Sequence, residues 1–187
     1  MDFIGNVRYQ STEESIEKAV MTLLKRKHYD SFSVKDICIE AGINRTTFYA
    51  HYQDINDFMI KFEGNLSKKM QAIWKPDGTS TVFGQDVFIA FFTFIQGYKV
   101  FYKAFLKDHI PSFLATDMLK KHKELFKQTM FRKGWNYTDA EIDYHLHFFG
   151  GGLKALSGRW IQNDCKETPE QMAKIIYEEY ANKSTLF

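Results

Sequence analysis

Apolar and polar residues alternate with a helical period along nearly the whole chain. Apolar positions recur three and four residues apart, as from Ile16 to Leu24, and the period-2 alternation of strands is hard to find. Residues 81–98 are apolar on almost every side, which is typical of a helix at the centre of a domain. The pattern predicts an all-α fold of about nine helices.

Four capping patterns divide this helical pattern into elements. Each has Ser or Thr three residues before an acid or Gln, the arrangement in which side chain and backbone satisfy each other at a helix start. The pairs are Ser11 with Glu14, Ser33 with Asp36, Thr138 with Glu141, and Thr168 with Gln171. We expect the first ten residues to form an arm before the first helix. Residues 75–79 form the clearest turn, and Pro111 is expected to open a further helix.

Two short helices joined by a tight turn are predicted for residues 33–52. Gly42 should end the first, because glycine adopts the left-handed conformation without a Cβ penalty. Asn44 should cap the second, which runs from Arg45 to His51. Only Phe48 and Tyr52 are expected to face inward. A helix with a thin buried side and a free side of Arg, Thr, Tyr and His suits a DNA groove.

Residues 41–58, AGINRTTFYAHYQDINDF, resemble the helix-turn-helix of the TetR family of transcriptional regulators. The shared features are the glycine turn, the Arg/Thr-bearing helix, the Tyr-x-His-aromatic core and the acid-flanked start of the next helix. Residues 148–176 resemble, more loosely, a C-terminal domain common among such regulators. The resemblance implies a three-helix DNA-binding domain at residues 1–53. It also implies an effector-binding and dimerisation domain at residues 54–187, joined through the fourth helix.

Candidate DNA contacts lie on the two short helices. Because they open the second helix, Arg45, Thr46 and Thr47 are expected at base edges, and Arg45 suits a bidentate guanine contact. By resemblance, Tyr49 and His51 hold the phosphate backbone, although Tyr49 could also be a packing residue. Contacts from Ser33 and Lys35 complete the set. Many relatives carry Lys directly after the acid that starts the fourth helix, and this chain has Ile55 there.

Two further sets of residues are predicted in the second half of the chain. Aromatic side chains with a few polar groups suit a pocket for a hydrophobic or aromatic ligand, although rings at helical spacing more often form plain core. The pocket candidates are Phe88, Phe91, Phe92, Tyr98, Tyr102, Trp135, Tyr144 and His147. By resemblance, the last two helices pair with their copies in a second subunit, the alternative being packing within one chain. The interface candidates are Gly151, Ala155, Gly158, Met172 and Ile176.

Charge and cysteine content narrow the possible classes. The chain of 187 residues has a formal net charge of +2, yet residues 1–65 hold eight Lys and Arg against ten Asp and Glu. That net charge of −2 is unexpected for a nucleic-acid reader. Cys38 and Cys165 have no metal-binding or redox spacing. The longest apolar run, residues 87–95, is too short for a membrane span, and residues 1–10 lack the apolar run and small-residue cleavage site expected of a signal peptide. We therefore expect a cytoplasmic protein.

No constellation of residues indicates an enzyme. The six histidines form no His-Glu-x-x-His motif, and no Gly-x-Ser-x-Gly, P-loop or Rossmann pattern occurs. Neither a cofactor nor a metal is predicted. The sequence favours a homodimeric regulator that binds operator DNA, as a repressor released by a small ligand. The alternative is a helical adaptor that uses the same surface for a protein partner.

Overall fold

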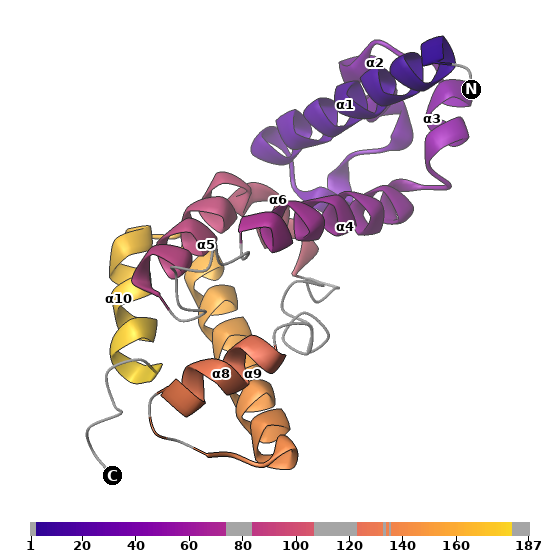
Figure 1. The fold of residues 1–187 in the computed structure, drawn as a ribbon. Helices are drawn as coiled ribbons and strands as arrows, with labels where there is room; N and C mark the ends of the chain where they lie inside the picture. The colour runs from indigo at the N-terminus through magenta and orange to yellow at the C-terminus, as the bar shows by residue number, and fades with distance from the viewer. Residues whose placement is uncertain (1–2, 74–83, 107–122, 133, 135, 181–187) are drawn as a thin grey trace. The chain divides into compact units, whose positions relative to one another are not determined.

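A computed structural model describes residues 3–73, 84–106, 123–132, 134 and 136–180, and all secondary structure in these ranges is helical (Figure 1). The elements are α1 (Phe3–Arg26), the 3-10 helix η1 (Tyr29–Ser31), α2 (Val34–Ala41), α3 (Arg45–His51), α4 (Ile55–Ile73), α5 (Gln85–Gly97), α6 (Lys99–Phe105), α8 (Lys123–Arg132), α9 (Asp139–Gln162) and α10 (Pro169–Tyr180). The predicted all-α class is confirmed. The turn expected at residues 75–79 and the helix start expected at Pro111 lie outside the described residues.

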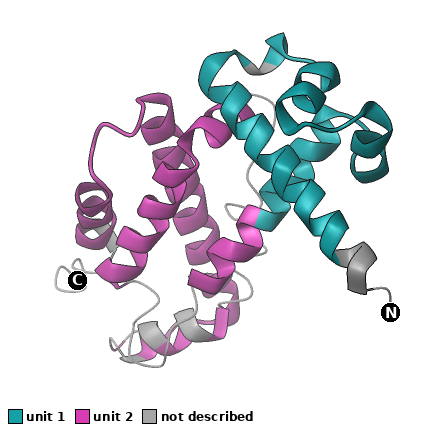
Figure 2. Ribbon diagram, turned by 90° about the horizontal axis from the view of Figure 1, so that it is seen from above, with its two compact units in different colours: residues 1–65 teal, residues 66–187 magenta. Residues whose placement is uncertain are grey.

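The chain forms two compact units, residues 1–65 and 66–187 (Figure 2). The helix α4 continues without a break across the boundary between Asn65 and Leu66. The functional domains predicted at residues 1–53 and 54–187 stay a prediction, because compactness alone assigns no role to either part.

The core of the first unit is formed where α1 packs on α2 and where α3 and α4 contribute one buried face each. Ile16 and Val20 of α1, Ile37 of α2, Phe48 of α3 and Phe58 of α4 are all fully buried. Each fully buried side chain of this size contributes about 1.5–3 kcal/mol relative to exposure. The helical spacing of the apolar residues therefore produces the three-helix arrangement that the sequence predicts.

The first helix begins eight residues earlier than predicted. Ser11 is not its N-cap, because α1 starts at Phe3 and the Ser11 carbonyl accepts a hydrogen bond from Ser15 Oγ at 2.9 Å. In the same way Thr12 Oγ1 donates to the carbonyl of Arg8 at 2.9 Å. Such bonds to the carbonyl four residues back let Ser and Thr stay inside a helix. The predicted N-terminal arm is therefore two further turns of α1.

In the second unit, α5 is central. Phe88, Phe91, Phe92 and Ile95 are completely buried, and α10 packs along α5. From α9, Phe149 lies 6.1 Å from the Phe88 ring, and Trp160 meets Phe92 edge-to-face at 5.2 Å. The α5 helix begins at Gln85, inside the predicted range 81–98, and its apolar circumference reflects burial on several sides.

The capping patterns predicted at the starts of the last two helices are confirmed. Glu141 N donates to Thr138 Oγ1, and Thr138 N donates back to Glu141 Oε2 at 2.8 Å. Thr168 N donates to Gln171 Oε1 at 2.8 Å ahead of α10. None of the described helices is both long enough and apolar enough to cross a membrane.

Candidate nucleic-acid interface

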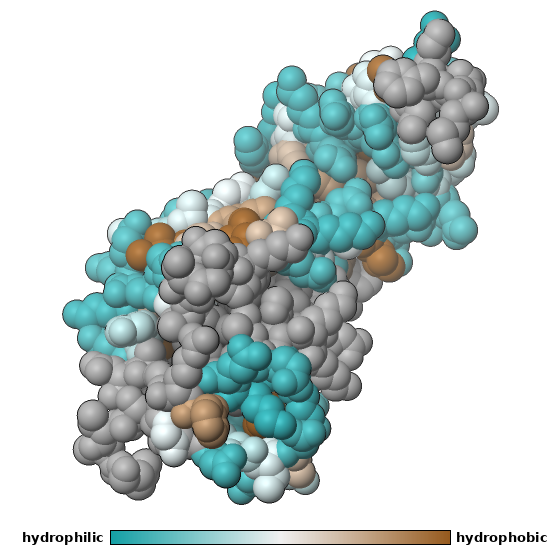
Figure 3. Space-filling view, viewed as in Figure 1, coloured by the Kyte–Doolittle hydropathy of each residue, from teal (hydrophilic) through white to brown (hydrophobic). Residues whose placement is uncertain are grey.

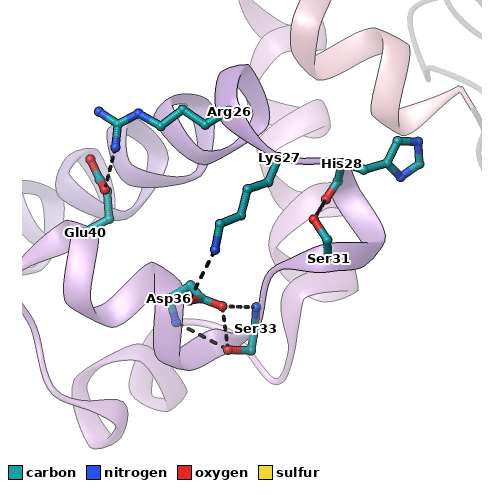
Figure 4. Close-up of polar contacts among 7 residues, drawn as sticks. All are labelled: Arg26, Lys27, His28, Ser31, Ser33, Asp36 and Glu40. Carbon is teal, nitrogen blue, oxygen red and sulfur yellow. Dashed lines mark hydrogen bonds and ion pairs between the residues drawn. The ribbon is translucent and has the colours of Figure 1, made fainter.

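The helix-turn-helix is built by local capping on both sides of a glycine turn. Ser33 Oγ accepts from the Asp36 backbone, and Ser33 N donates to Asp36 Oδ2 at 2.8 Å, a complete capping box at the start of α2 (Figure 4). Gly42 ends α2 with φ of +68°, in the left-handed region. Asn44 Oδ1 then accepts from Thr47 N at 2.7 Å and starts α3. All three features agree with the sequence prediction.

The helix α3 presents a free side opposite Phe48. Arg45, Thr46 and Tyr49 are exposed, and the Tyr49 and Phe48 rings form a T-shaped pair with centroids 5.6 Å apart. On α2, Lys35 is also exposed. Because hydroxyl, phenol and guanidinium groups at a helix surface can donate to base edges and phosphates, these four residues retain the predicted chemistry.

Two other predicted DNA contacts already use their donors within the chain. Both Ser33 donors are taken by Asp36, since Oγ as well as N donates to Oδ2 at 2.8 Å. The Thr47 hydroxyl donates to Asn44 Oδ1 at 3.0 Å and is half-buried. A phosphate contact by Ser33 or a base contact by Thr47 would therefore have to replace a capping bond.

His51 is buried, contrary to the expectation that it faces outward. Only 8% of the residue is exposed, and its ring stacks on Tyr9 of α1 with centroids 3.9 Å apart. The physical reason is the upstream extension of α1, which covers the C-terminal end of α3. His51 therefore belongs to the packing of α3 rather than to its free surface, and we withdraw it as a phosphate contact.

Arg26, the last residue of α1, and Lys27, which follows it, are paired with acids of α2. Arg26 Nη1 lies 3.3 Å from Glu40 Oε2, and Lys27 Nζ lies 3.7 Å from Asp36 Oδ1 (Figure 4). The Ser33 backbone N–H and hydroxyl, followed by the charge of Lys27, lower the pKa of the Asp36 carboxyl. Part of the acidic charge of residues 1–65 is thus neutralised inside the unit.

The start of α4 is capped by two acids that flank Ile55, the position at which the family resemblance leads us to expect a lysine. Asp54 Oδ1 accepts from Asp57 N at 2.7 Å, and Asp57 Oδ2 accepts from Gln53 N at 2.8 Å and from Lys61 Nζ at 2.9 Å. The Gln53 N–H and then Lys61 lower the pKa of Asp57. Ile55 is half-buried. This helix end offers side-chain acceptors rather than a cation for a phosphate.

The predicted effector residues separate into two groups. Phe88, Phe91, Phe92 and Tyr102 are fully buried, and Tyr98 is half-buried beside Phe94. Tyr144 and His147 instead are exposed and line a surface hollow on α9 together with Ala140 and Asp143. They lie on the opposite side of α9 from Ile142 and Leu146, so their inclusion in an internal pocket does not fit the structure. Trp135 lies outside the described residues.

The predicted dimer residues separate in a similar way. Gly151 and Ala155 are exposed, and Gly158 is half-buried. Met172 and Ile176 are only 4% exposed, because the apolar face of α10 packs on the chain's own α5. Little of these two side chains is left for a partner subunit in this arrangement of α10, and their place at a dimer interface stays a prediction.

An exposed, mainly apolar stripe runs along α9, and all of its residues except Phe148 were identified from the sequence. Tyr144 is 77% and Phe148 72% exposed, and they precede Gly151 and Ala155 at spacings of four, three and four residues. On the face shown in Figure 3 most described residues are hydrophilic, and apolar ones form only small groups. The i, i+4, i+7, i+11 spacing is visible in the sequence, but its exposure is a tertiary property.

The described residues form neither a metal-binding cluster nor an exposed thiol. Among the residues that the structure describes, no three His, Cys, Asp or Glu side chains gather as a metal site. Both cysteines are buried, and burial raises the pKa of Cys38 and of Cys165.

The arrangement of α2, the Gly42 turn and the exposed α3 defines a helix-turn-helix protein. Residues 84–179 match the family model described as "Transcriptional regulator C-terminal region", of the TetR type. Together with the helix-turn-helix relatives below, this match shows that the chain belongs to the TetR family of transcriptional regulators.

A curated relative covers nearly the whole chain. It is described as an uncharacterized HTH-type transcriptional regulator, YxbF of Bacillus subtilis (strain 168), and is 21% identical over 182 residues. The match covers 93% of this chain and 46% of the relative, so the chain spans about half the length of the curated relative it matches.

Solved structures share the fold. The dihydroxyacetone kinase operon activator DhaS superposes with a TM-score of 0.66 at 19% identity, covering 94% of this chain and 97% of DhaS. A TetR transcriptional regulator from Streptococcus agalactiae 2603V gives a TM-score of 0.62 at 19% identity, covering 96% and 98%. The fatty acid degradation regulator FadR from Bacillus halodurans gives 0.64 at 15% identity, covering 89% and 93%.

Proposed function

We propose that the chain is a dimeric, sequence-specific DNA-binding regulator that inserts α3 into the major groove of an operator. The observation that carries this proposal is the free side of α3, where Arg45, Thr46 and Tyr49 are exposed while Phe48 anchors the helix. Side chains at the N-terminal end of a recognition helix reach base edges. We assign the base contacts to Arg45 and Thr46, and the phosphate contacts to Lys35 and Tyr49.

The test is DNA binding by fluorescence anisotropy on the region upstream of the protein's own gene. We expect Arg45→Ala to weaken binding about 5- to 150-fold per half-site and to relax sequence preference, the effect of losing a bidentate base contact. Tyr49→Ala should weaken binding to all sequences equally, because a phosphate contact carries no base information. Lys18→Ala is the matched control, since Lys18 is an exposed cation on α1. Equal binding by the Arg45 variant and this control would contradict the proposal.

Salt dependence separates DNA binding from the alternative of a protein partner. If Lys35 neutralises one phosphate in each of the two subunits, the logarithm of the binding constant falls with a slope of about −1.8 against the logarithm of the salt concentration. An Ile55→Lys variant adds a cation where relatives often carry one and should steepen the slope by about 1.8 per dimer. A slope near zero in both proteins would favour the adaptor.

Dimerisation is proposed through the exposed stripe of α9 rather than through the buried face of α10. Tyr144 and Phe148 present aromatic surface, and Gly151 and Ala155 are small and exposed beside it. A Cβ at Gly151 would meet no atom within 4 Å in the chain itself. Since an interior helical glycine costs about 1 kcal/mol relative to alanine, close approach of a second copy supplies a compensating gain.

Regulation is proposed as repression that a small hydrophobic or aromatic ligand relieves. The buried rings of α5 and α6, among them Phe92 and Tyr102, are the candidate ligand neighbours. A ligand acts by binding one conformation better than another. Movement of α4 would then change the separation of the two α3 helices from the 34–36 Å that adjacent half-sites need. A reporter gene under the operator tests whether the protein represses or activates. Deleting a repressor would raise expression of the reporter, whereas deleting an activator would lower it.

A further inference from the structure

The C-terminal end of α3 is held by two different elements of the first unit. From α1, the Tyr9 ring stacks on the His51 ring with centroids 3.9 Å apart and planes 27° from parallel. From α4, Lys61 Nζ donates to the His51 carbonyl oxygen at 3.2 Å and to Asp57 Oδ2 at 2.9 Å. Figure 1 shows α3 beside the end of α1 where the chain begins. The side chain and the backbone of His51 are therefore fixed separately.

The other contacts of the His51 side chain are longer, with the Tyr52 ring tilted against it at 6.1 Å between centroids. The His51 Nδ1 atom is buried without a hydrogen-bond partner, and Glu13 Oε1 lies 3.9 Å from it. Glu13 lies one turn after Tyr9 on α1, so one face of α1 supplies both contacts. Without a directional bond at Nδ1, the stacked ring of Tyr9 is what defines the orientation of the imidazole.

A short helix depends strongly on such contacts. The helix α3 has seven residues, fewer than the 12–15 or so that make an isolated helix marginally stable in water. Its described buried side chains are Phe48 in the middle and His51 at the end, and Asn44 caps its start. Removing the support at His51 leaves the middle and the start anchored while the last turn can fray or tilt.

We propose that Tyr9 is a positioning residue for α3, so that the first two turns of α1 form part of the DNA-reading apparatus. This inference rests on the proposed function for its effect on DNA, and on the structure alone for its effect on α3. Tyr9 acts through His51 and need not touch the duplex. Its ring stack fixes the tilt of α3, and that tilt determines whether Arg45 and Tyr49 reach the groove together.

Three variants test the role of the ring. Tyr9→Ala removes the stack, Tyr9→Phe keeps the ring without the hydroxyl, and Val7→Ala truncates another exposed side chain two residues away. Aromatic pairs of this kind correspond to about a 2- to 10-fold change in an equilibrium constant. We expect Tyr9→Ala to weaken operator binding about 2- to 10-fold per half-site, whereas the other two variants bind like the wild type.

Hydrogen exchange in the free protein gives a readout that needs no DNA. The amide of Tyr52 donates to the Phe48 carbonyl at 3.0 Å and reports on the last turn of α3. We expect Tyr9→Ala to speed its exchange about 2- to 10-fold while leaving the amides of α2 unchanged. Tyr9→Phe should restore the wild-type exchange rate.

The outcomes are distinguishable. Unchanged exchange and unchanged DNA binding in Tyr9→Ala would overturn the inference, as would equal losses in Tyr9→Ala and Val7→Ala. Equal loss of exchange protection across α2 and α3 would also overturn it, because Tyr9 would then stabilise the whole unit. If the wild type binds no DNA, the proposed function fails, and the exchange of Tyr52 still decides whether Tyr9 positions α3.

Discussion

Replacing Gly151 with alanine should have opposite effects on the isolated chain and on the proposed dimer. Gly151 lies inside α9 (Asp139–Gln162), is exposed, and has no atom within 4 Å of where a Cβ would be. In the isolated chain, alanine therefore adds no clash and raises the free energy of unfolding by about 1 kcal/mol through helix propensity. For a protein of this size that corresponds to a rise of about 2–4 °C in the melting temperature.

In a dimer packed through α9, the same methyl group meets the second copy. Overpacking a close contact costs about 1–3 kcal/mol, and the two-fold symmetry of a dimer applies the substitution twice. A cost of at least about 2 kcal/mol raises the dimer dissociation constant roughly 30-fold. The added methyl group would therefore stabilise the folded monomer and destabilise the dimer.

The measurement is sedimentation velocity over a concentration series, paired with thermal unfolding at a concentration where the variant is monomeric. Gly64→Ala is the matched control, because Gly64 also lies inside a long helix, α4, with nothing within 4 Å of its Cβ position. The control should stabilise the chain without weakening the dimer. If Gly151→Ala gives the same dimer dissociation constant as Gly64→Ala, the second copy does not pack at Gly151.

Two further predictions concern the helix-turn-helix. Asp36 has a lowered pKa in the folded protein, so its capping bonds with Ser33 stabilise above the unfolded-state value of 3.8 and are lost as the pH falls through the folded-state pKa. The stability gap between wild type and Asp36→Asn, measured by urea unfolding, should therefore narrow below about pH 4; a gap that stays constant would contradict this. Gly42→Ala should lower the free energy of unfolding by about 1–2 kcal/mol, because Gly42 has φ of +68° with open space around it. Gly42→Asn should cost less, since asparagine tolerates this conformation, and equal losses would argue against backbone strain.

Local signals in the sequence predicted much of the helix-turn-helix. The capping box of Ser33, the left-handed Gly42 and the Asn44 cap each depend on residues fewer than four positions apart, and the structure has all three. Their spacing could be read directly because the geometry of a cap is independent of the rest of the fold. The same reasoning failed at Ser11, where a capping pattern lies inside a longer helix.

Tertiary context determined the features that sequence reasoning missed. His51 is polar and lies beside exposed residues, but an upstream turn of α1 brings Tyr9 over it. Met172 and Ile176 form an apolar face, and a helical period cannot tell whether that face meets α5 or a second copy. The helical pattern predicted the apolar face of α10 correctly and placed His51 on the wrong side of α3, and in both cases it did not contain the identity of the covering element.

Part of the acidic charge of the first 65 residues is used in ion pairs within the first unit. Glu40 pairs with Arg26 and Asp36 pairs with Lys27 where the end of α1 meets α2. The negative charge of these two acids is therefore balanced within the unit and repels a nucleic acid less than unpaired acids would. Exposed ion pairs of this kind contribute little stability, about 0–1 kcal/mol each, but they also remove two cations from phosphate binding. Under the proposed function, DNA binding then depends on fewer charges and more on the fit of α3 in the groove. A DNA-binding protein with few phosphate contacts gains proportionally more from a rigid recognition helix, and under the proposed function the support of α3 at both of its ends supplies that rigidity.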